Sequence, residues 1–319
     1  MSNVRRHNQP ADYRADLMTT SKPSSPRLWH YTSKEATLGI IGFSCLWATS
    51  ILYLNDADEF HHVRHLVTDW IKRTRQENSL GFPEEYRLLT GRQATLVRFL
   101  ERQLTGQRAL HTYVVSFSEL ADDLSQWRAY GSSGGFCLAF ESDWLREVAS
   151  KQHFELFECV YNHSEKRTLV EKLMLEALAD FAAIEAQISD DDLSAGLGIY
   201  MDLGPSAVLS GLGDRFFLQA QQLACRIKNQ AFQAEREWRL VSIKQPEPNS
   251  LNFRTNKSML IPYLKFRLAE DSKPMKLSAL MAGPSPHASL NMLAAATLCK
   301  AKALFGIELS RTRLPYRDW

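Results

Sequence analysis

The sequence lacks a strong net charge and a long hydrophobic run. Its 319 residues include 38 basic and 36 acidic side chains, which gives a formal net charge of +2. A dedicated nucleic-acid-binding domain is normally far more basic, so the overall charge argues against that class. No segment reaches the apolar length of a membrane-spanning helix, and the first residues lack the charged-then-apolar order of a signal peptide. We therefore expect a cytoplasmic protein with no membrane partner.

Cysteine is scarce, and no two cysteines form a C-x-x-C pair. An odd number of scattered cysteines with mostly apolar neighbours is typical of reduced, buried thiols. None of them has the local signature of a cysteine nucleophile. The five are Cys45, Cys137, Cys159, Cys225 and Cys299.

Motifs for common cofactors are also missing. His61 and His65 stand one helical turn apart near Glu59 and His62, but no further ligand has recognisable spacing, so we predict no metal. The glycine-rich loop at 131–135 lacks both the lysine of a P-loop and the spacing of a dinucleotide-binding motif. There is no G-x-S-x-G motif of a serine hydrolase.

What the sequence does contain is enough apolar residues for a large core, at 45% of the chain. We expect a polar, flexible arm at 1–26 and a single α+β domain at 27–319, with a helical insertion at about 164–230. Period-2 and apolar runs predict strands at 27–31, 45–50, 111–118, 136–140, 154–161, 238–243, 259–266, 279–282 and 304–309. Spacing of three or four predicts helices at 59–71, 91–104, 164–188, 209–227 and 289–302.

The tripeptide His30-Tyr31-Thr32 ends the first predicted strand. Thr32 and Glu35 have the spacing of a capping box ahead of an amphipathic helix. The amide groups at that helix start could hold a phosphate or ribose oxygen, with His30 as a further directional contact. The alternative is a structural histidine that ties its strand to a neighbour.

Two later groups could also carry chemistry. Glu235 and Glu237, two residues apart where a strand begins, should point to the same side and could take different catalytic roles, one on the substrate and one on the acceptor. The alternative is an edge strand whose alternating charges prevent aggregation. Trp127 and Tyr130 could sandwich a flat heterocycle at a loop mouth near Ser116, or they could pack at helical spacing.

Six short segments in a fixed order resemble the bacterial domain-of-unknown-function family DUF2971, over about residues 28–317. They are Leu28-Trp29-His30-Tyr31-Thr32, Leu46-Trp47-Ala48-Thr49 with Asn55-Asp56 and Glu59, Ser116-Phe117-Ser118, Trp127-x-x-Tyr130 with Gly135-Phe136-Cys137-Leu138, Glu235-x-Glu237-Trp238-Arg239-Leu240, and the ending at 310–317. That family is distantly similar to the ADP-ribosyltransferases, which use NAD as a substrate.

The resemblance implies split antiparallel sheets and a site assembled from the first strand, a middle strand and a late glutamate. Glu237 and Glu235 would then be catalytic. The residues that would bind NAD are His30, Tyr31, Thr32, Tyr53, Asn55, Arg64, Ser116 and Tyr130. The resemblance leaves open which of Tyr53, Tyr130 and Ser116 supplies the middle residue of the site.

The expected function is ADP-ribosylation of a protein or nucleic acid by a bacterial toxin or antiphage effector, with an antitoxin or regulatory protein as a further partner. The alternatives are an NAD hydrolase and a non-catalytic module that binds a nucleotide or a protein.

Overall fold

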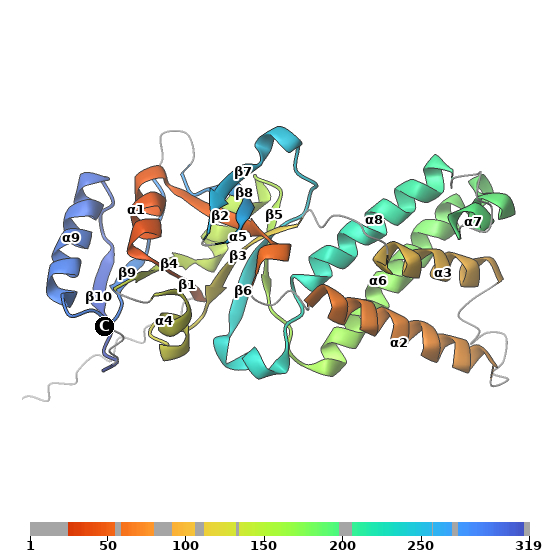
Figure 1. Ribbon diagram of the computed structural model, residues 1–319, viewed down its shortest axis with the longest axis horizontal. Coiled ribbons are helices and arrows are strands. Elements are labelled where there is room, and N and C mark those ends of the chain that lie inside the picture. The colour runs from red at the N-terminus through yellow and green to blue at the C-terminus, as the bar shows by residue number, and fades with distance from the viewer. Residues whose placement is uncertain are drawn as a thin grey trace, which may run out of the picture.

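The computed structural model describes residues 25–54, 59–79, 91–105, 112–131, 134–197, 206–256, 258–269 and 274–315. The chain forms two lobes side by side, one built on a β-sheet and one made of helices (Figure 1). The predicted arm at 1–26 lies almost wholly outside the described residues. The structure confirms the mixed α+β class.

The sheet lobe contains a sheet of ten strands within the described residues. The strands are β1 (Arg27–Thr32), β2 (Cys45–Ser50), β3 (Tyr113–Ser118), β4 (Phe136–Glu141), β5 (Phe154–Glu158), β6 (Glu237–Ser242), β7 (Asn252–Thr255), β8 (Leu260–Arg267), β9 (Ala279–Ala282) and β10 (Glu308–Arg311). The main path runs β10-β9-β4-β1-β3-β2-β8-β7, and β6 with β5 branches off β3. β9 and β10 pair in parallel, whereas the other strand pairs are antiparallel.

The sheet forks at β3. On one edge of β3, β6 pairs with five consecutive residues. On the other edge, β1 pairs only at Ser118, and β2 pairs only at Tyr113 and Val114. The middle of β3 is therefore the point from which two wings diverge, β1-β4-β9-β10 and β2-β8-β7.

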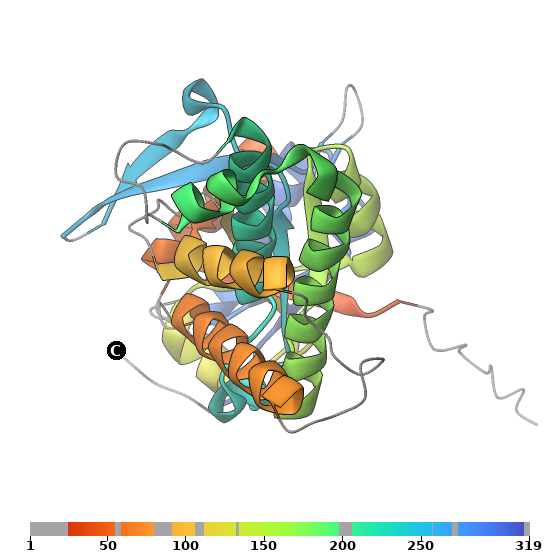
Figure 2. The same ribbon diagram turned by 90° about the vertical axis from the view of Figure 1, so that its right-hand side faces the viewer.

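The helices divide between the lobes. They are α1 (Lys34–Phe43), α2 (Glu59–Ser79), α3 (Gly91–Thr105), α4 (Leu124–Tyr130), α5 (Ser142–Ser150), α6 (His163–Ile184), α7 (Asp190–Gly196), α8 (Ala207–Ala224) and α9 (Ala288–Ala301). The helices α2, α3, α6, α7 and α8 pack together in the helical lobe (Figure 2). The predicted insertion at 164–230 thus supplies only part of this lobe, because α2 and α3 come from a separate segment.

Apolar periodicity explains the helical lobe. Phe181 of α6 and Leu212 and Phe216 of α8 are buried in one core, and Val241 of β6 joins that core to the sheet. Burying such side chains contributes roughly 1.5–3 kcal/mol each. None of the described helices is long and apolar enough to cross a membrane.

All five cysteines are buried and unpaired in the structure, which confirms the prediction of free thiols. Burial raises the pKa of Cys45, Cys137 and Cys299 above the ordinary thiol value. A thiol that stays protonated is a poor nucleophile, so these three side chains act as small apolar groups in the core.

The start of α1 differs from the prediction. Thr32 is still part of β1, where it pairs with Phe136, so the cap falls one residue later. Ser33 is the N-cap, and its hydroxyl accepts a hydrogen bond from the backbone N–H of Ala36 at 3.1 Å. The predicted capping box of Thr32 with Glu35 was therefore wrong by one residue, because strand pairing decides where the helix begins.

Candidate functional site

A cavity of about 600 Å³ lies in the fork between β1 and β2. The predicted site residues that line it are His30, Tyr31, Thr32, Tyr53, Ser116, Tyr130 and Glu237. A smaller pocket of about 90 Å³ adjoins it and is lined by Glu235 together with His30, Ser116, Tyr130 and Glu237. Side chains from segments far apart in the sequence thus meet at one place.

Two predicted residues do not join this group. Arg64 belongs to α2, which leads into the helical lobe, and it is not among the described residues that line either pocket. It lies five residues beyond Glu59, roughly 7 Å farther along the helix axis. Arg64 therefore does not line these two pockets, because α2 runs from the fork into the helical lobe (Figure 1). Asn55 lies outside the described residues.

The strand β3 brings His30 and Glu237 together. The His30 ring lies 2.9 Å, through Nδ1, from the backbone carbonyl oxygen of Ser116. Glu237 pairs with Ser118, two residues farther along the same strand, which is roughly 7 Å. The two side chains are therefore within reach of one ligand.

The hydrogen bond to Ser116 determines the state of the histidine. A carbonyl oxygen can only accept, so Nδ1 carries the proton and donates it, and Nε2 is left as an acceptor. Burial lowers the pKa of His30, although the hydrogen bond to Ser116 opposes this. His30 is therefore a neutral hydrogen-bond acceptor at pH 7. Its contact with Ser116 joins β1 to β3, so it also agrees with the alternative of a structural histidine that ties its strand to a neighbour.

Glu237 is a buried carboxylate held by two cations. Lys228 Nζ donates to Oε2 at 2.5 Å, and Arg239 Nε donates to Oε1 at 2.8 Å. Burial alone would raise the pKa of Glu237, but the charges of Arg239 and Lys228 lower it to about 2. Glu237 is thus a fixed anion at neutral pH and is too weak a base to accept a proton there.

The ion pairs extend on both sides of Glu237. Both guanidinium Nη atoms of Arg239 donate to Glu59, at 2.6 and 2.8 Å. Lys228 Nζ also donates to Glu235 at 2.7 Å. Burial raises the pKa of Glu59, and the charge of Arg239 opposes that rise. With all five groups ionised, three carboxylates and two cations leave one net negative charge at this end of the cavity.

Glu235 and Glu237 do lie on the same side, since both contact Lys228. The cause differs from the predicted strand alternation. Glu235 ends the short 3₁₀ helix η4 (Gln230–Glu235), and Arg236 follows with a φ of 44° in the left-handed region. A turn therefore places the pair, and β6 begins only at Glu237. β6 is flanked by β3 and β5, so the alternative of an exposed edge strand does not hold.

The aromatic residues Trp127 and Tyr130 have different roles. Tyr130 is 45% exposed at the end of α4 and lines both pockets. Trp127 is fully buried, and its Nε1 donates to Asp122 at 2.7 Å. A Cβ at Gly131 would lie 2.4 Å from Trp127 Cε3. This glycine therefore makes room for the Trp127 ring, which packs in the core, whereas the Tyr130 ring lies at the pockets.

The helix start at α1 is a poorer anion site than the sequence suggests. The carboxylate of Glu35 accepts a hydrogen bond from its own backbone N–H, and a contact with Ser33 adds to this; both lower the pKa of Glu35. An acidic side chain thus already occupies the positive end of the helix dipole. A phosphate in the cavity would need another cation.

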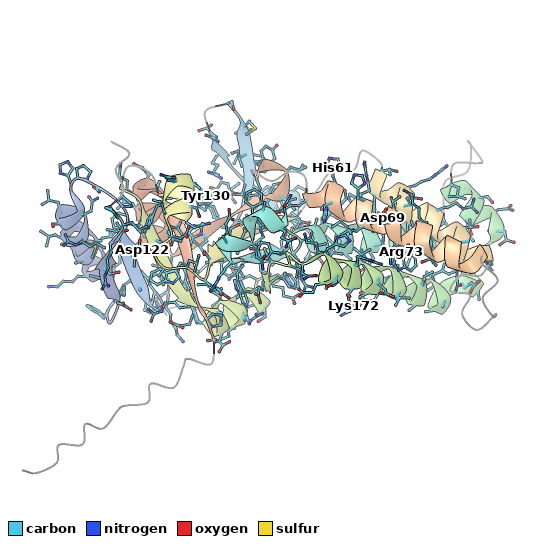
Figure 3. All side chains as sticks on the ribbon, turned by 90° about the horizontal axis from the view of Figure 1, so that it is seen from below. His61, Asp69, Arg73, Asp122, Tyr130 and Lys172 are labelled. Carbon is cyan, nitrogen blue, oxygen red and sulfur yellow. The ribbon has the colours of Figure 1, made fainter. Side chains whose placement is uncertain are left out.

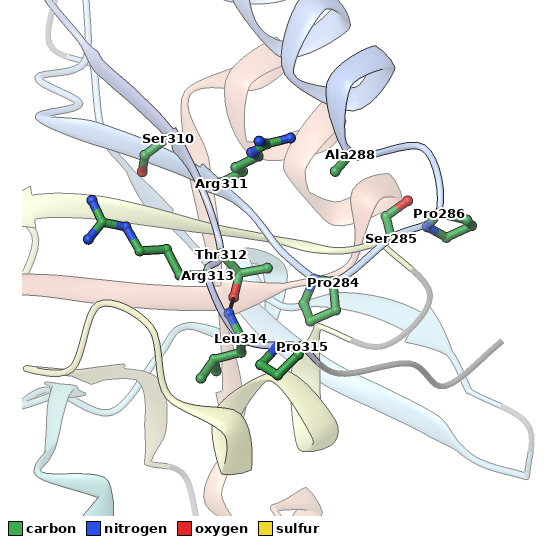
Figure 4. Close-up of a pocket in the computed structure, with 10 residues that line it drawn as sticks. All are labelled: Pro284, Ser285, Pro286, Ala288, Ser310, Arg311, Thr312, Arg313, Leu314 and Pro315. Carbon is green, nitrogen blue, oxygen red and sulfur yellow. Dashed lines mark hydrogen bonds between the residues drawn. The ribbon is translucent and has the colours of Figure 1, made fainter.

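Two other features do not carry this chemistry. His61 and His65 are exposed on α2, and no group of three metal-binding side chains is found among the described residues (Figure 3, where His61 is labelled). Another cavity, of about 1060 Å³, lies between the start of α9 and the segment after β10 (Figure 4). The described residues that line it include no acid or histidine. This cavity therefore offers no carboxylate that could stabilise a developing positive charge, as Glu237 could.

Sequence reasoning missed several residues that line the main cavity. Lys228 lies in a loop after α8 and has no motif around it. Trp47 and Arg254 come from β2 and β7, the wing opposite β1. Arg239 stands two residues after Glu237 on β6, and this alternation was the only available signal of its contact with the glutamate.

A known protein family matches part of the chain. A family model described as a protein of unknown function (DUF2971) matches residues 126–240, which run from α4 to β6. This segment includes Tyr130, Lys228, Glu235, Glu237 and Arg239. No curated protein and no solved structure matches the chain. Residues 126–240 of this chain are therefore similar to the DUF2971 family.

Proposed function

We propose that the protein is an ADP-ribosyltransferase that uses NAD as a substrate and modifies a macromolecule. The observation that carries the proposal is the meeting of His30, Tyr130 and Glu237 at one cavity, although they come from three distant segments. The resemblance to the ADP-ribosyltransferases implies split antiparallel sheets and a site assembled from the first strand, a middle strand and a late glutamate, and these three residues fit that description.

The size and charge of the cavity support a dinucleotide substrate. A volume of about 600 Å³ is typical of a cavity for a small-molecule ligand or cofactor. The net negative charge around Glu237 suits the cationic nicotinamide ring of NAD. It also suits the positive charge that develops on the ribose when that ring leaves.

The reaction breaks the bond between ribose C1′ and the nicotinamide nitrogen. Both bonding electrons go to the nitrogen, so neutral nicotinamide leaves and an oxocarbenium-like centre forms at C1′. A nucleophilic group of the acceptor then bonds to C1′ and loses its proton. The fixed anion of Glu237 stabilises the positive charge without taking up a proton itself.

The other residues orient the substrate. His30 Nε2 accepts a hydrogen bond from a ribose hydroxyl, and the ring of Tyr130 or Tyr53 stacks on nicotinamide. Glu235 is 21% exposed at the edge of the pocket and is placed to contact the acceptor. The acceptor is a protein or a nucleic acid, and the role is that of a bacterial toxin or antiphage effector under the control of an antitoxin or regulatory protein. An NAD hydrolase would use the same residues with water as the acceptor.

One observation favours a non-catalytic nucleotide-binding module as a second candidate. Both oxygens of Glu237 already accept hydrogen bonds from cations, so the carboxylate could serve the fold alone. The two candidates differ in whether nicotinamide is released.

The test is to incubate the purified protein with NAD and measure nicotinamide release. We expect release by the parent protein and a fall of at least about a hundredfold in kcat for Glu237→Gln, as for loss of one electrostatic contact to a transition state. Glu171→Gln is the matched control, because Glu171 is exposed on α6 and far from the cavity. An unfolding midpoint measured for both variants separates a loss of chemistry from a loss of fold.

Release that is equal in Glu237→Gln and the parent would contradict the proposed role of Glu237. The absence of release, together with binding of NAD, would favour the binding module. Release without transfer to any macromolecule of a cell extract would favour the hydrolase.

A further inference from the structure

Arg254 is a cation without an acidic partner at the main cavity. It lies on β7, lines the cavity, and donates through Nη2 to Thr49 Oγ1 at 3.2 Å. Its Nε is buried and has no hydrogen-bond partner among the residues that the structure describes. No carboxylate of the described residues forms an ion pair with Arg254. The contact with Thr49 therefore satisfies only one of the guanidinium donors.

The other two cations that line the cavity behave differently. Lys228 contacts Glu235 and Glu237, and Arg239 contacts Glu59 and Glu237. Their charges are already compensated within the protein. A partly buried guanidinium without such compensation carries a desolvation cost, which an anionic ligand would remove. Arg254 is thus the cation here that a ligand can pair with.

The position of Arg254 gives the cavity two ends of opposite charge. Arg254 contacts Thr49, which pairs with Val114 of β3, whereas Glu237 pairs with Ser118 of β3. These positions on β3 are four residues apart, roughly 14 Å. A ligand that spans them is extended, with positive charge near Glu237 and negative charge near Arg254.

A flat apolar surface lies beside Arg254. Trp47 lines the cavity, is 48% exposed, and stands two residues before Thr49 on the same face of β2. Its ring stacks on Tyr263, with centroids 4.6 Å apart and planes at 27°. The stack with Tyr263 holds the indole ring in place while it stays exposed at the cavity, where an aromatic base can pack on it.

We propose that Arg254 binds the diphosphate of a nucleoside diphosphate group whose base packs on Trp47. The guanidinium offers planar, paired donors that suit phosphate oxygens. The N-terminus of α1 does not compete for the diphosphate, since the Glu35 carboxylate already occupies that helix end. The inference rests on the proposed function in taking this group to be the ADP portion of NAD.

The experiment measures binding of ADP-ribose, ADP and adenosine to the full chain by calorimetry. Variant Arg254→Gln removes the charge, and Arg254→Lys retains it. Arg98→Gln is the control, because Arg98 is exposed on α3, donates to Ala94 of the same helix, and is not among the residues that line the cavity. We expect Arg254→Gln to weaken ADP and ADP-ribose binding roughly tenfold to a hundredfold and to leave adenosine binding unchanged. Arg254→Lys should recover part of that loss.

The stacking contact has its own variant. Trp47→Ala should weaken binding of ADP and of adenosine by the same factor, because the base is common to both. Equal unfolding midpoints for parent and variants would show that the fold is kept.

Equal affinity of Arg254→Gln and the parent for ADP, or no ADP binding by the parent, would overturn the inference. The proposed transferase activity is tested separately. If ADP binding depends on Arg254 but NAD yields no nicotinamide, the proposed phosphate site is supported and the proposed transferase activity is contradicted. If nicotinamide is released with the same KM for NAD in Arg254→Gln and the parent, the proposed phosphate site is contradicted and the proposed cleavage of NAD is supported.

Discussion

Arg239 and Glu59, 180 residues apart in the chain, form a buried two-fold hydrogen-bonded ion pair at 2.6 and 2.8 Å. This pair joins β6 of the sheet lobe to the first turn of α2 in the helical lobe. Because Arg239 also holds Glu237, the packing of the two lobes and the geometry of the cavity depend on one side chain.

Replacing Arg239 should destabilise the protein strongly. In Arg239→Met the carboxylates of Glu59 and Glu237 lose a buried cation, and breaking such a pair typically costs about 3–5 kcal/mol. Arg215→Met is the control, because the Arg215–Asp180 pair is exposed and is worth at most about 1 kcal/mol. Urea unfolding measures both free energies. Equal costs for the two variants would contradict the role given to the buried pair.

Stability should fall in acid through Glu237. Its pKa is about 2 in the folded protein against an ordinary 4.5, so its contribution is present above pH 4.5 and is lost as the pH falls toward 2. The full contribution is about 3 kcal/mol, of which about 1 kcal/mol is lost by pH 3.5. The raised pKa of Glu59 acts with the opposite sign. Urea unfolding at pH 7 and pH 3.5 should therefore show a smaller loss in Glu237→Gln than in the parent.

His30 should titrate below the ordinary histidine pKa of 6.5 and carry its proton on Nδ1. Burial disfavours the charged ring, and the carbonyl of Ser116 selects the tautomer. Because the folded pKa is lowered, protonation of His30 should cost stability as the pH falls below 6.5. Nitrogen NMR of the labelled imidazole reports both the midpoint and the tautomer. A midpoint above 6.5, or a proton on Nε2, would contradict the description of His30 as a neutral acceptor.

Gly131→Ala should destabilise the protein by about 1–3 kcal/mol, because the added Cβ would lie 2.4 Å from the buried Trp127 ring and overpack the core. Gly211→Ala on α8 is the matched control. Nothing lies within 4 Å of a Cβ at Gly211, so alanine there should stabilise the helix by up to about 1 kcal/mol. Thermal unfolding compares the two. Loss of stability in Gly211→Ala as large as in Gly131→Ala would rule out steric conflict with Trp127 as the cause.

Local patterns predicted the larger elements well and the small or polar ones poorly. The strands at 45–50 and 279–282 match β2 and β9, because each is a largely apolar run in which all but one residue is buried. The strand predicted at 304–309 lies at 308–311 as β10, since pairing with β9 rather than apolar content sets its place. β7 was not predicted, because its four residues alternate between half-buried and exposed positions and include polar side chains.

The candidate site was predictable where its residues carry a recognisable pattern next to them. His30 ends a strand before a helix, and Glu237 stands in a charged run that enters a strand. The sequence could not show that Arg64 lies off these pockets, because nothing in it indicates the direction in which α2 leaves the fork. Lys228 and Arg254 were missed because single basic residues in polar surroundings do not differ from ordinary surface residues.

The sequence by itself determined the α+β class, most of the helices and strands, the five free cysteines and the chemical types of the candidate site. These properties follow from hydrophobic periodicity and residue chemistry, which act over a few neighbouring residues. Only the tertiary structure decided that β3 forks the sheet, that Glu237 is held by Lys228 and Arg239, and that Arg254 has no acidic partner within the described part of the chain. Ion pairs and cavities depend on contacts between distant segments, such as Glu59 and Arg239, which are 180 residues apart, and no local pattern encodes them.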